Sequence, residues 1–197
     1  MQQWRQGAFA DTKQAALNLK NIDRTASLAL HKCKWSGYEK WIGLVHHKEN
    51  QRAGFIGLQT CSKVWLCPIC SARISWQRKN ELDALFIWAR SEGYVVKMLT
   101  LTARHNRNTD LNTFLDGLKK AKQALRRRRE WAALPLVGTV TATEVTHGKN
   151  GWHPHFHEIL ILKDDAEFQK LRSAWLSCLG RYGLTGNDAA FQVQDAT

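Results

Sequence analysis

One segment constrains the fold more than any other: HGKNGWHPHFHEILIL, from His147 to Leu162, alternates residue types with a period of two. Side chains alternate faces along a β-strand, so residues two apart point the same way. The pattern therefore predicts a strand with two distinct faces. One face carries His153, His155, His157, Ile159 and Ile161, and the other carries Pro154, Phe156, Glu158, Leu160 and Leu162. Both faces become apolar toward the end of the strand, which is typical of a central strand covered on each side.

The preceding segment GTVTATEV, Gly138 to Val145, predicts a second strand that pairs with the first across a turn near Asn150-Gly151. Two registers are open. A turn centred on Asn150-Gly151 puts Glu144 opposite His157, whereas a loop from His147 to Trp152 puts Glu144 opposite His155. In both registers Glu144 lies on the histidine face, where cross-strand neighbours have β-carbons about 5 Å apart.

Two imidazoles and one carboxylate form a metal-ligand set that leaves coordination positions open for water or a substrate oxygen. We therefore predict a metal site at Glu144, His155 and His157. His153 lies nearest the turn, and three roles stay open for it: a further ligand, a supporting neighbour of the ligands, or a phosphate contact. The competing interpretation is that these histidines are ordinary hydrogen-bonded core residues.

The other segments predict an α+β fold, with an antiparallel sheet and helices packed on one of its faces. A short helical pattern lies near Thr25–Leu30, and the glycine- and aromatic-rich residues from Cys33 to Cys70 indicate short strands and turns. The remaining expected elements are helices over Ile74–Gly93, Asp110–Leu134 and Ala166–Gly180, a strand over Tyr94–Ala103, and the start of a strand at Phe191.

The cysteines indicate a second metal site. CSKVWLCPIC brings Cys61, Cys67 and Cys70 together, and the two-residue gap of Cys-Pro-Ile-Cys lets both sulfurs reach one Zn²⁺ at about 2.3 Å. Cys33 is the natural fourth ligand and His31 is its substitute. We expect the zinc to brace an N-terminal region, residues 1–73, ahead of a second domain over residues 74–197. The alternative is a set of ordinary buried cysteines, as we expect for Cys178 in the last helix.

Charge favours a polyanionic partner, because 29 lysines and arginines outnumber 17 acidic residues. The basic residues expected to contact DNA phosphates are Lys119, Lys120, Lys122, Arg126, Arg127, Arg128 and Arg129, joined by Lys97, Arg104, Arg107 and His105. A solvated helix face is the alternative for any single one of them. Nine tryptophans are many for this length, and a minority could stack on unpaired bases. No long apolar stretch or signal peptide stands out, so we expect a cytoplasmic protein with no membrane partner.

Three segments, GWHPHFHEILIL, TEVTHGKN and KMLTLTARH, resemble the plasmid rolling-circle replication initiators of the HUH endonuclease superfamily. The resemblance covers roughly Cys33 to Ala196, and similar initiators carry a comparable cysteine set. It implies an RRM-like palm in which Glu144, His155 and His157 hold Mg²⁺ or Mn²⁺ against the scissile phosphate of plasmid-origin DNA, single-stranded or hairpin. It also implies a tyrosine nucleophile, a 5′-phosphotyrosine link and a free 3′-hydroxyl that primes replication, with a host helicase and polymerase as further partners.

The sequence departs from that family at the nucleophile, which normally lies on a helix after the last strand. Of the three tyrosines, Tyr38 lies among the cysteines and Tyr94 opens a strand; Tyr182, in a glycine-flanked turn, is a weak fallback. We expect a form truncated at its C-terminus that binds metal and origin DNA but nicks poorly. Two other functions stay open: a non-catalytic, zinc-containing DNA-binding module or inhibitory short form, and a zinc hydrolase, although no HExxH occurs here. The oligomeric state is not indicated.

Overall fold

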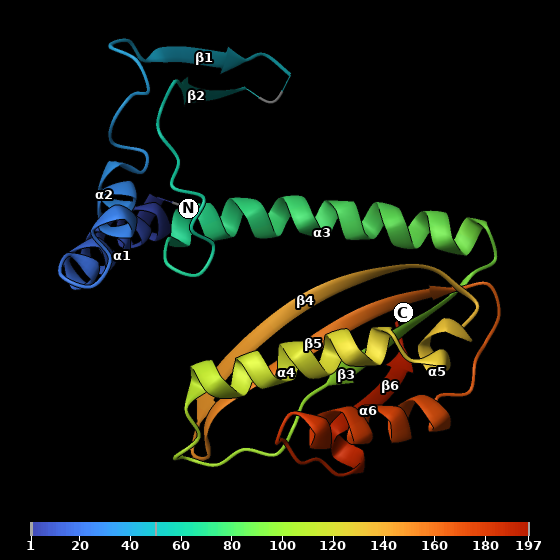
Figure 1. The fold of residues 1–197 in the computed structure, drawn as a ribbon. Helices are drawn as coiled ribbons and strands as arrows, with labels where there is room; N and C mark the ends of the chain where they lie inside the picture. Colours follow the sequence, from blue (N-terminus) through green and yellow to red (C-terminus); the bar gives the residue numbers. More distant parts are fainter. Residues whose placement is uncertain (1, 50, 197) are drawn as a thin grey trace. The chain divides into compact units, whose positions relative to one another are not determined.

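The computed structural model describes residues 2–49 and 51–196, and it divides into two compact units, Met1–Asp83 and Ala84–Thr197. The border falls inside the long helix α3 (Pro68–Ser91). Figure 1 shows the elements of both units in chain order. None of the helices within the described residues is long and apolar enough to cross a membrane.

The first unit contains α1 (Gln2–Leu19), α2 (Arg24–Lys32), the hairpin β1 (Gly43–His47) with β2 (Arg52–Ile56), and the start of α3. The short strands expected between Cys33 and Cys70 are therefore present. Helix α2 covers the expected pattern, and the Asp23 carboxylate accepts a hydrogen bond from the Ala26 backbone N–H at 2.9 Å to cap it.

Two features of this unit differ from the sequence prediction. Helix α1 was not predicted, because the side chains that it buries are small: Ala8, Thr12 and Ala16. Helix α3 starts at Pro68 rather than near Ile74. Proline suits the first turn of a helix, where its missing N–H costs no hydrogen bond.

The second unit is built on a four-stranded antiparallel sheet of order β4-β5-β3-β6. Its elements are β3 (Val95–Leu101), α4 (Leu111–Arg126), α5 (Arg129–Ala132), β4 (Leu136–Gly148), β5 (Gly151–Leu162), α6 (Gln169–Arg181), a 3₁₀ turn η1 (Asp188–Ala190) and β6 (Phe191–Asp195). Helices α4 and α6 pack together on the sheet (Figure 1), and their apolar residues share one core with Phe156, Leu160 and Leu162 of β5. The predicted α+β class is confirmed.

The helix expected over Asp110–Leu134 is wrong in its length, because α4 ends at Arg126 and a separate turn, α5, follows. The buried stripe of α4 is Phe114, Leu118, Ala121 and Leu125. In an unbroken helix Trp131 would lie about 100° away from that stripe. The break at Arg128, whose backbone is extended, lets Trp131 enter the core instead.

Strand β5 is central, between β4 and β3, as the sequence predicted. The register pairs Glu144 with His155 and Gly148 with Gly151, which is the second of the two registers considered. Gly151 has a φ of +86°, and a β-carbon there would lie 3.1 Å from the Asn106 carbonyl oxygen. Leu160, Ile161 and Leu162 are all buried, whereas the histidines at the other end of the strand remain partly exposed.

Candidate metal sites

Glu144, His155 and His157 converge on the face of the sheet opposite α4 and α6. The Nε2 atoms of His155 and His157 lie 3.0 Å and 3.1 Å from the same carboxylate oxygen, Oε2 of Glu144. Among the described residues these three form a group whose potential ligand atoms all lie within 4.8 Å of one another. The set could hold a metal ion, as the strand alternation predicted.

The outer nitrogens of the two histidines have partners that orient the rings. The Thr100 hydroxyl lies 3.1 Å from Nδ1 of His157, and the His153 carbonyl oxygen lies 3.4 Å from Nδ1 of His155. An Nδ1–H that donates to such an oxygen leaves Nε2 as the nitrogen with a free lone pair for a cation. Thr100 was not predicted from the sequence. It lies directly across from His157 in the pairing of β3 with β5, so finding it requires the register between these two strands.

The three side chains differ in exposure: 13% for His155, 27% for His157 and 51% for Glu144. The carboxylate therefore forms the open side of the site, where water or a phosphate oxygen can approach. The hydrogen bonds from His157 and His155 hold the pKa of Glu144 below its ordinary value, so the carboxylate stays ionised and available.

His153 lies apart from this group. Its Nδ1 is 2.5 Å from Nε2 of His105, and the second ring nitrogen of His105 contacts the Asn150 carbonyl oxygen at 3.2 Å. Burial lowers the pKa of His153, and the neighbouring His105 and His155 lower it further. The pair lines a pocket of about 350 Å³ that also includes Arg104. The sequence did not indicate that His105 and His153 are neighbours, and the structure brings them together.

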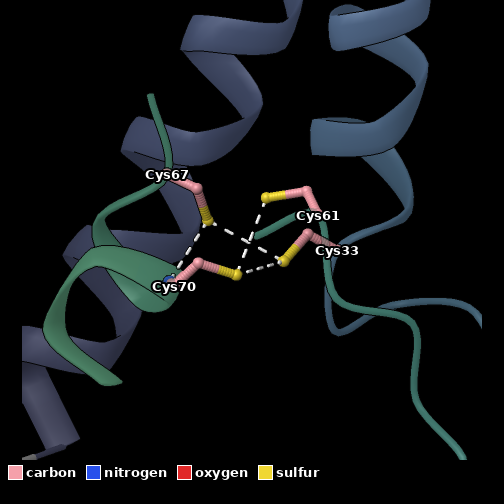
Figure 2. A group of neighbouring side chains, drawn as sticks. All are labelled: Cys33, Cys61, Cys67 and Cys70. Atoms are coloured by element: carbon pink, nitrogen blue, oxygen red, sulfur yellow. Dashed lines mark hydrogen bonds between the residues drawn. The ribbon is translucent and has the colours of Figure 1, made fainter. Parts of the chain in front are cut away.

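Cys33, Cys61, Cys67 and Cys70 form the second group (Figure 2). Cys33 follows α2, Cys61 follows β2, and Cys67 and Cys70 stand at the start of α3. The Sγ–Sγ distances are 3.8 Å for Cys33–Cys67, 3.5 Å for Cys33–Cys70 and 3.6 Å for Cys61–Cys70. A tetrahedral ion with bonds of about 2.3 Å requires sulfurs about 3.8 Å apart. The four thiols are therefore spaced for one metal ion; His31 is exposed and outside the group.

The surroundings of these thiols are apolar and mostly closed to solvent. Burial raises the pKa of Cys33 to about 11 and also raises the pKa of Cys61. Burial acts the same way on Cys67, but its pKa is lowered overall, because the Cys70 backbone N–H at 3.5 Å and the Thr12 hydroxyl at 3.7 Å contact its sulfur. Without a metal the thiols of Cys33 and Cys61 hold their protons, so metal binding here must release protons.

Several of the basic residues expected to contact DNA make ion pairs within the protein. Arg126 and Lys122 lie 2.7 Å and 3.3 Å from the two carboxylate oxygens of Glu158, which is fully buried on the helix-covered face of β5. Lys97 pairs with Asp165 at 3.1 Å and Asp195 at 2.8 Å. Glu158 was not predicted from the sequence as the partner of Arg126 and Lys122. Its position between Phe156 and Leu160, on an apolar strand face, could have indicated a buried acid that needs a cation.

The other predicted basic positions lie at the surface. Lys119, Arg104 and Arg107 are exposed, and Arg127, Arg128 and Arg129 are exposed at the break between α4 and α5. Lys120 pairs with Asp116 at 2.7 Å. Cys178 is buried in the core of the second unit, as expected.

No tyrosine of the described chain belongs to the histidine face. Tyr182 caps the end of α6, on the helix-covered side of the sheet. Tyr94 packs edge-on against Trp88, with ring centroids 5.5 Å apart. The Tyr38 oxygen accepts a hydrogen bond from the Thr60 backbone N–H at 3.3 Å, in the first unit.

These features define a class: an α+β protein with a histidine–carboxylate group on the open face of an antiparallel sheet and a separate four-cysteine unit. Residues 55–177 match the family model described as "Replication protein", and the chain belongs to that family. The family resemblance inferred from the HPHFH segment is thereby confirmed.

The chain is similar to "Protein rep" of Streptomyces lividans, with 32% identity over 146 residues, covering 58% of this chain and 32% of the relative. It is also similar to "Neomycin resistance protein" of Streptomyces cyanogenus, with 30% identity over 145 residues, covering 58% and 33%. "Protein rep" of Lentilactobacillus hilgardii is 32% identical over 101 residues, covering 50% and 32%. The chain thus spans about a third of the length of these curated relatives. No solved structure matches it.

Proposed function

We propose that this chain carries the DNA-nicking site of a rolling-circle replication initiator. The activity is metal-dependent, site-specific cleavage of one strand of plasmid-origin DNA. One observation carries the proposal: Glu144, His155 and His157 converge on the open face of the β4–β5 hairpin, in a chain of the replication protein family. The cytoplasm is the place of action that this function requires, and a host helicase and polymerase are the partners that would follow the nick.

The donor atoms fit the divalent cation that this chemistry needs. One carboxylate and two imidazoles at a partly exposed position suit Mn²⁺ or Mg²⁺ with open coordination positions. When bound there, such an ion supplies Lewis-acid stabilisation of negative charge on the scissile phosphate. Thr100 and the His153 carbonyl hold the imidazoles in the orientation that this requires. The four thiols fit Zn²⁺, which we assign a structural role because Cys33, Cys67 and Cys70 are buried.

The nucleophile is the part of the proposal that lies outside this chain. Tyr182 is on the opposite side of the sheet from His155 and His157, so it is poorly placed to attack a phosphate held at the histidines. We therefore assign the tyrosine that would form the 5′-phosphotyrosine link to sequence beyond these 197 residues. The greater length of the relatives is compatible with that assignment.

The test uses Mn²⁺ and a labelled single-stranded origin oligonucleotide. We expect about one Mn²⁺ per chain at this site by electron paramagnetic resonance, tighter oligonucleotide binding with Mn²⁺ present, and loss of both in the double variant His155→Ala/His157→Ala. The alanine variant of Tyr182 should leave both unchanged. When the reading frame is extended until it supplies a tyrosine, Mn²⁺ should yield a covalent protein–DNA band. Mn²⁺ binding that survives the double histidine variant would refute the proposal.

A further inference from the structure

The first unit carries a pocket that the nicking site does not use. It has a volume of about 500 Å³ and is lined by Phe9, Ala10, Lys13, Lys34 and Trp35. Pockets that take small molecules or single groups of a polymer fall in this size range, roughly 300–1,000 Å³. Two aromatic rings and two ammonium groups thus surround one space. We call this set of five residues the Trp35 pocket.

The indole of Trp35 is the main surface of the Trp35 pocket. Trp35 is 57% exposed, although an indole is among the most costly side chains to leave in water. The Phe9 ring meets it edge-on with centroids 5.7 Å apart, and the Lys13 ammonium lies over one face of the indole, 4.3 Å from its ring centroid, so a base has the other face to stack on. An exposed π face beside cations is the combination that binds an unpaired base together with its phosphate.

The four-cysteine group fixes both walls of the Trp35 pocket. On one side, the Thr12 hydroxyl donates to the Ala8 carbonyl oxygen at 2.7 Å and contacts the Cys67 sulfur, which anchors the helix face next to Phe9 and Lys13. On the other side, Cys33 directly precedes Lys34 and Trp35. Both walls of the Trp35 pocket are therefore attached to the four-cysteine group.

The backbone at Lys34 is a second, independent sign of function. Lys34 has a φ of +61°, in the left-handed region that lysine rarely adopts, and its N–H donates to the Gln59 carbonyl oxygen at 2.8 Å. Such strain persists where the surrounding structure imposes it, and it clusters at ligand-binding positions. Here it turns the chain so that Lys34 and Trp35 both line the same pocket.

Further aromatic side chains continue from Trp35 along the same connection. Tyr38 and Trp41, three and six residues later, are both well exposed, and Lys40 lies between them. The segment from residue 34 to residue 65 contains five lysines and arginines but only two acidic residues. This charge balance complements a nucleic-acid backbone, and the aromatic spacing offers successive surfaces for bases.

We propose that the Trp35 pocket is a second DNA-binding site, which holds one unpaired nucleotide with its base on the Trp35 ring and its phosphate at Lys13 and Lys34. The ligand class is single-stranded DNA. A duplex is disfavoured, because the faces of its bases are covered by the base pairs stacked above and below. The site goes beyond the nicking activity, since it lies in the other compact unit and requires neither Glu144 nor the histidines.

The experiment measures binding of fluorescein-labelled oligothymidylate to the full chain by fluorescence anisotropy, without added Mg²⁺ or Mn²⁺. We expect Trp35→Ala to raise Kd roughly 5- to 100-fold, the range for loss of one base stack. Trp35→Phe should keep most of the affinity. The matched control is Trp76→Ala, since Trp76 is 65% exposed on α3 and lines no part of the Trp35 pocket. It should leave Kd unchanged.

The salt dependence of DNA binding distinguishes a phosphate contact from a structural role of the two lysines. Removing one phosphate contact should reduce the slope of log K against log salt by about 0.7 for single-stranded DNA. We expect that reduction for Lys34→Gln and for Lys13→Gln, but not for the control Lys20→Gln, since Lys20 is exposed and lines no part of the Trp35 pocket. If Trp35→Ala changes the metal content or the circular dichroism, the two lysine variants decide the matter.

Three outcomes would overturn the proposal: equal affinities for Trp35→Ala and Trp76→Ala, unchanged salt slopes in both lysine variants, or equal binding of duplex and single-stranded DNA. The histidine variant His155→Ala/His157→Ala separates this site from the nicking site. We expect it to bind oligothymidylate normally under these conditions. A failure of the nicking proposal would therefore leave this measurement intact, and the reverse also holds.

Discussion

Replacing Arg126 by alanine tests whether this arginine, at the end of α4, binds DNA or stabilises the fold. Arg126 donates to Oε2 of Glu158 at 2.7 Å, and the Thr141 hydroxyl donates to the same oxygen at 3.1 Å. Glu158 has no exposure to solvent. Arg126→Ala would therefore leave a buried carboxylate with Lys122, at 3.3 Å, as its only cation within the described residues.

The magnitude follows from that geometry. Removing one partner of a fully buried ion pair costs about 3–5 kcal/mol, and a hydrogen bond to a charged group contributes about 1.5–3 kcal/mol. Arg126 is 37% exposed and Lys122 remains close to Glu158, so the lower part of these ranges applies. We expect a loss of about 2–3 kcal/mol in the free energy of unfolding, which corresponds to a fall of roughly 5–15 °C in Tm.

Differential scanning calorimetry measures this loss, and hydrogen exchange in β5 assigns the transition to the second unit. The matched control is Arg127→Ala, since Arg127 is exposed at the end of the same helix. Arg127→Ala should stay within about 0.5 kcal/mol of the parent. If both variants lose the same stability, Arg126 does not hold the buried carboxylate. If Arg126→Ala weakens DNA binding without destabilising the fold, the arginine serves DNA, and the structural argument fails.

Three further predictions concern the metal groups. Thr100→Val should weaken Mn²⁺ binding about 10- to 100-fold, because His157 loses the partner of its Nδ1; unchanged affinity in a Mn²⁺ titration would contradict this. In the metal-free protein His157 and His155 lower the pKa of Glu144, so its contribution to stability is present above the ordinary range of a glutamate and is lost as pH falls through the folded-state pKa. The Tm difference between the parent and Glu144→Gln should therefore shrink on acidification, and a difference that grows would refute the assignment. Cys70→Ser should abolish stoichiometric zinc by atomic absorption and expose the first unit to proteolysis, while the sheet of the second unit stays protected.

The histidine–carboxylate group could be predicted because a strand has a fixed period. Once β4 and β5 pair across a tight turn, every register with the same parity puts Glu144 on the face of His155 and His157. The sequence left two such registers open. The choice between them depends on the loop, where Gly151 approaches Asn106 too closely for a side chain, and that approach is a tertiary contact.

The elements that could not be predicted depend on packing between distant segments. Helix α1 buries a row of small residues, Ala8, Thr12 and Ala16, whose hydrophobic signal is too weak to show a face. The partner of this face comes from a distant segment, because the Thr12 hydroxyl contacts the sulfur of Cys67. The break after α4 likewise appears only when Trp131 has a core to enter.

The two faces of β5 also explain why the two acids of this hairpin, Glu144 and Glu158, have different surroundings. The open face carries Glu144, His155 and His157, which could hold a cation, and the covered face carries Glu158, whose buried charge requires one. On the covered face the protein supplies its own cations, Lys122 and Arg126, to a Glu158 carboxylate that has no exposure to solvent. On the open face Glu144 is the acid that contacts His155 and His157, and its half-exposed carboxylate leaves room for an ion from solvent. The same alternation therefore buries one acid of this hairpin in an ion pair with the protein's own cations and leaves the other half-exposed, where it could bind a metal ion.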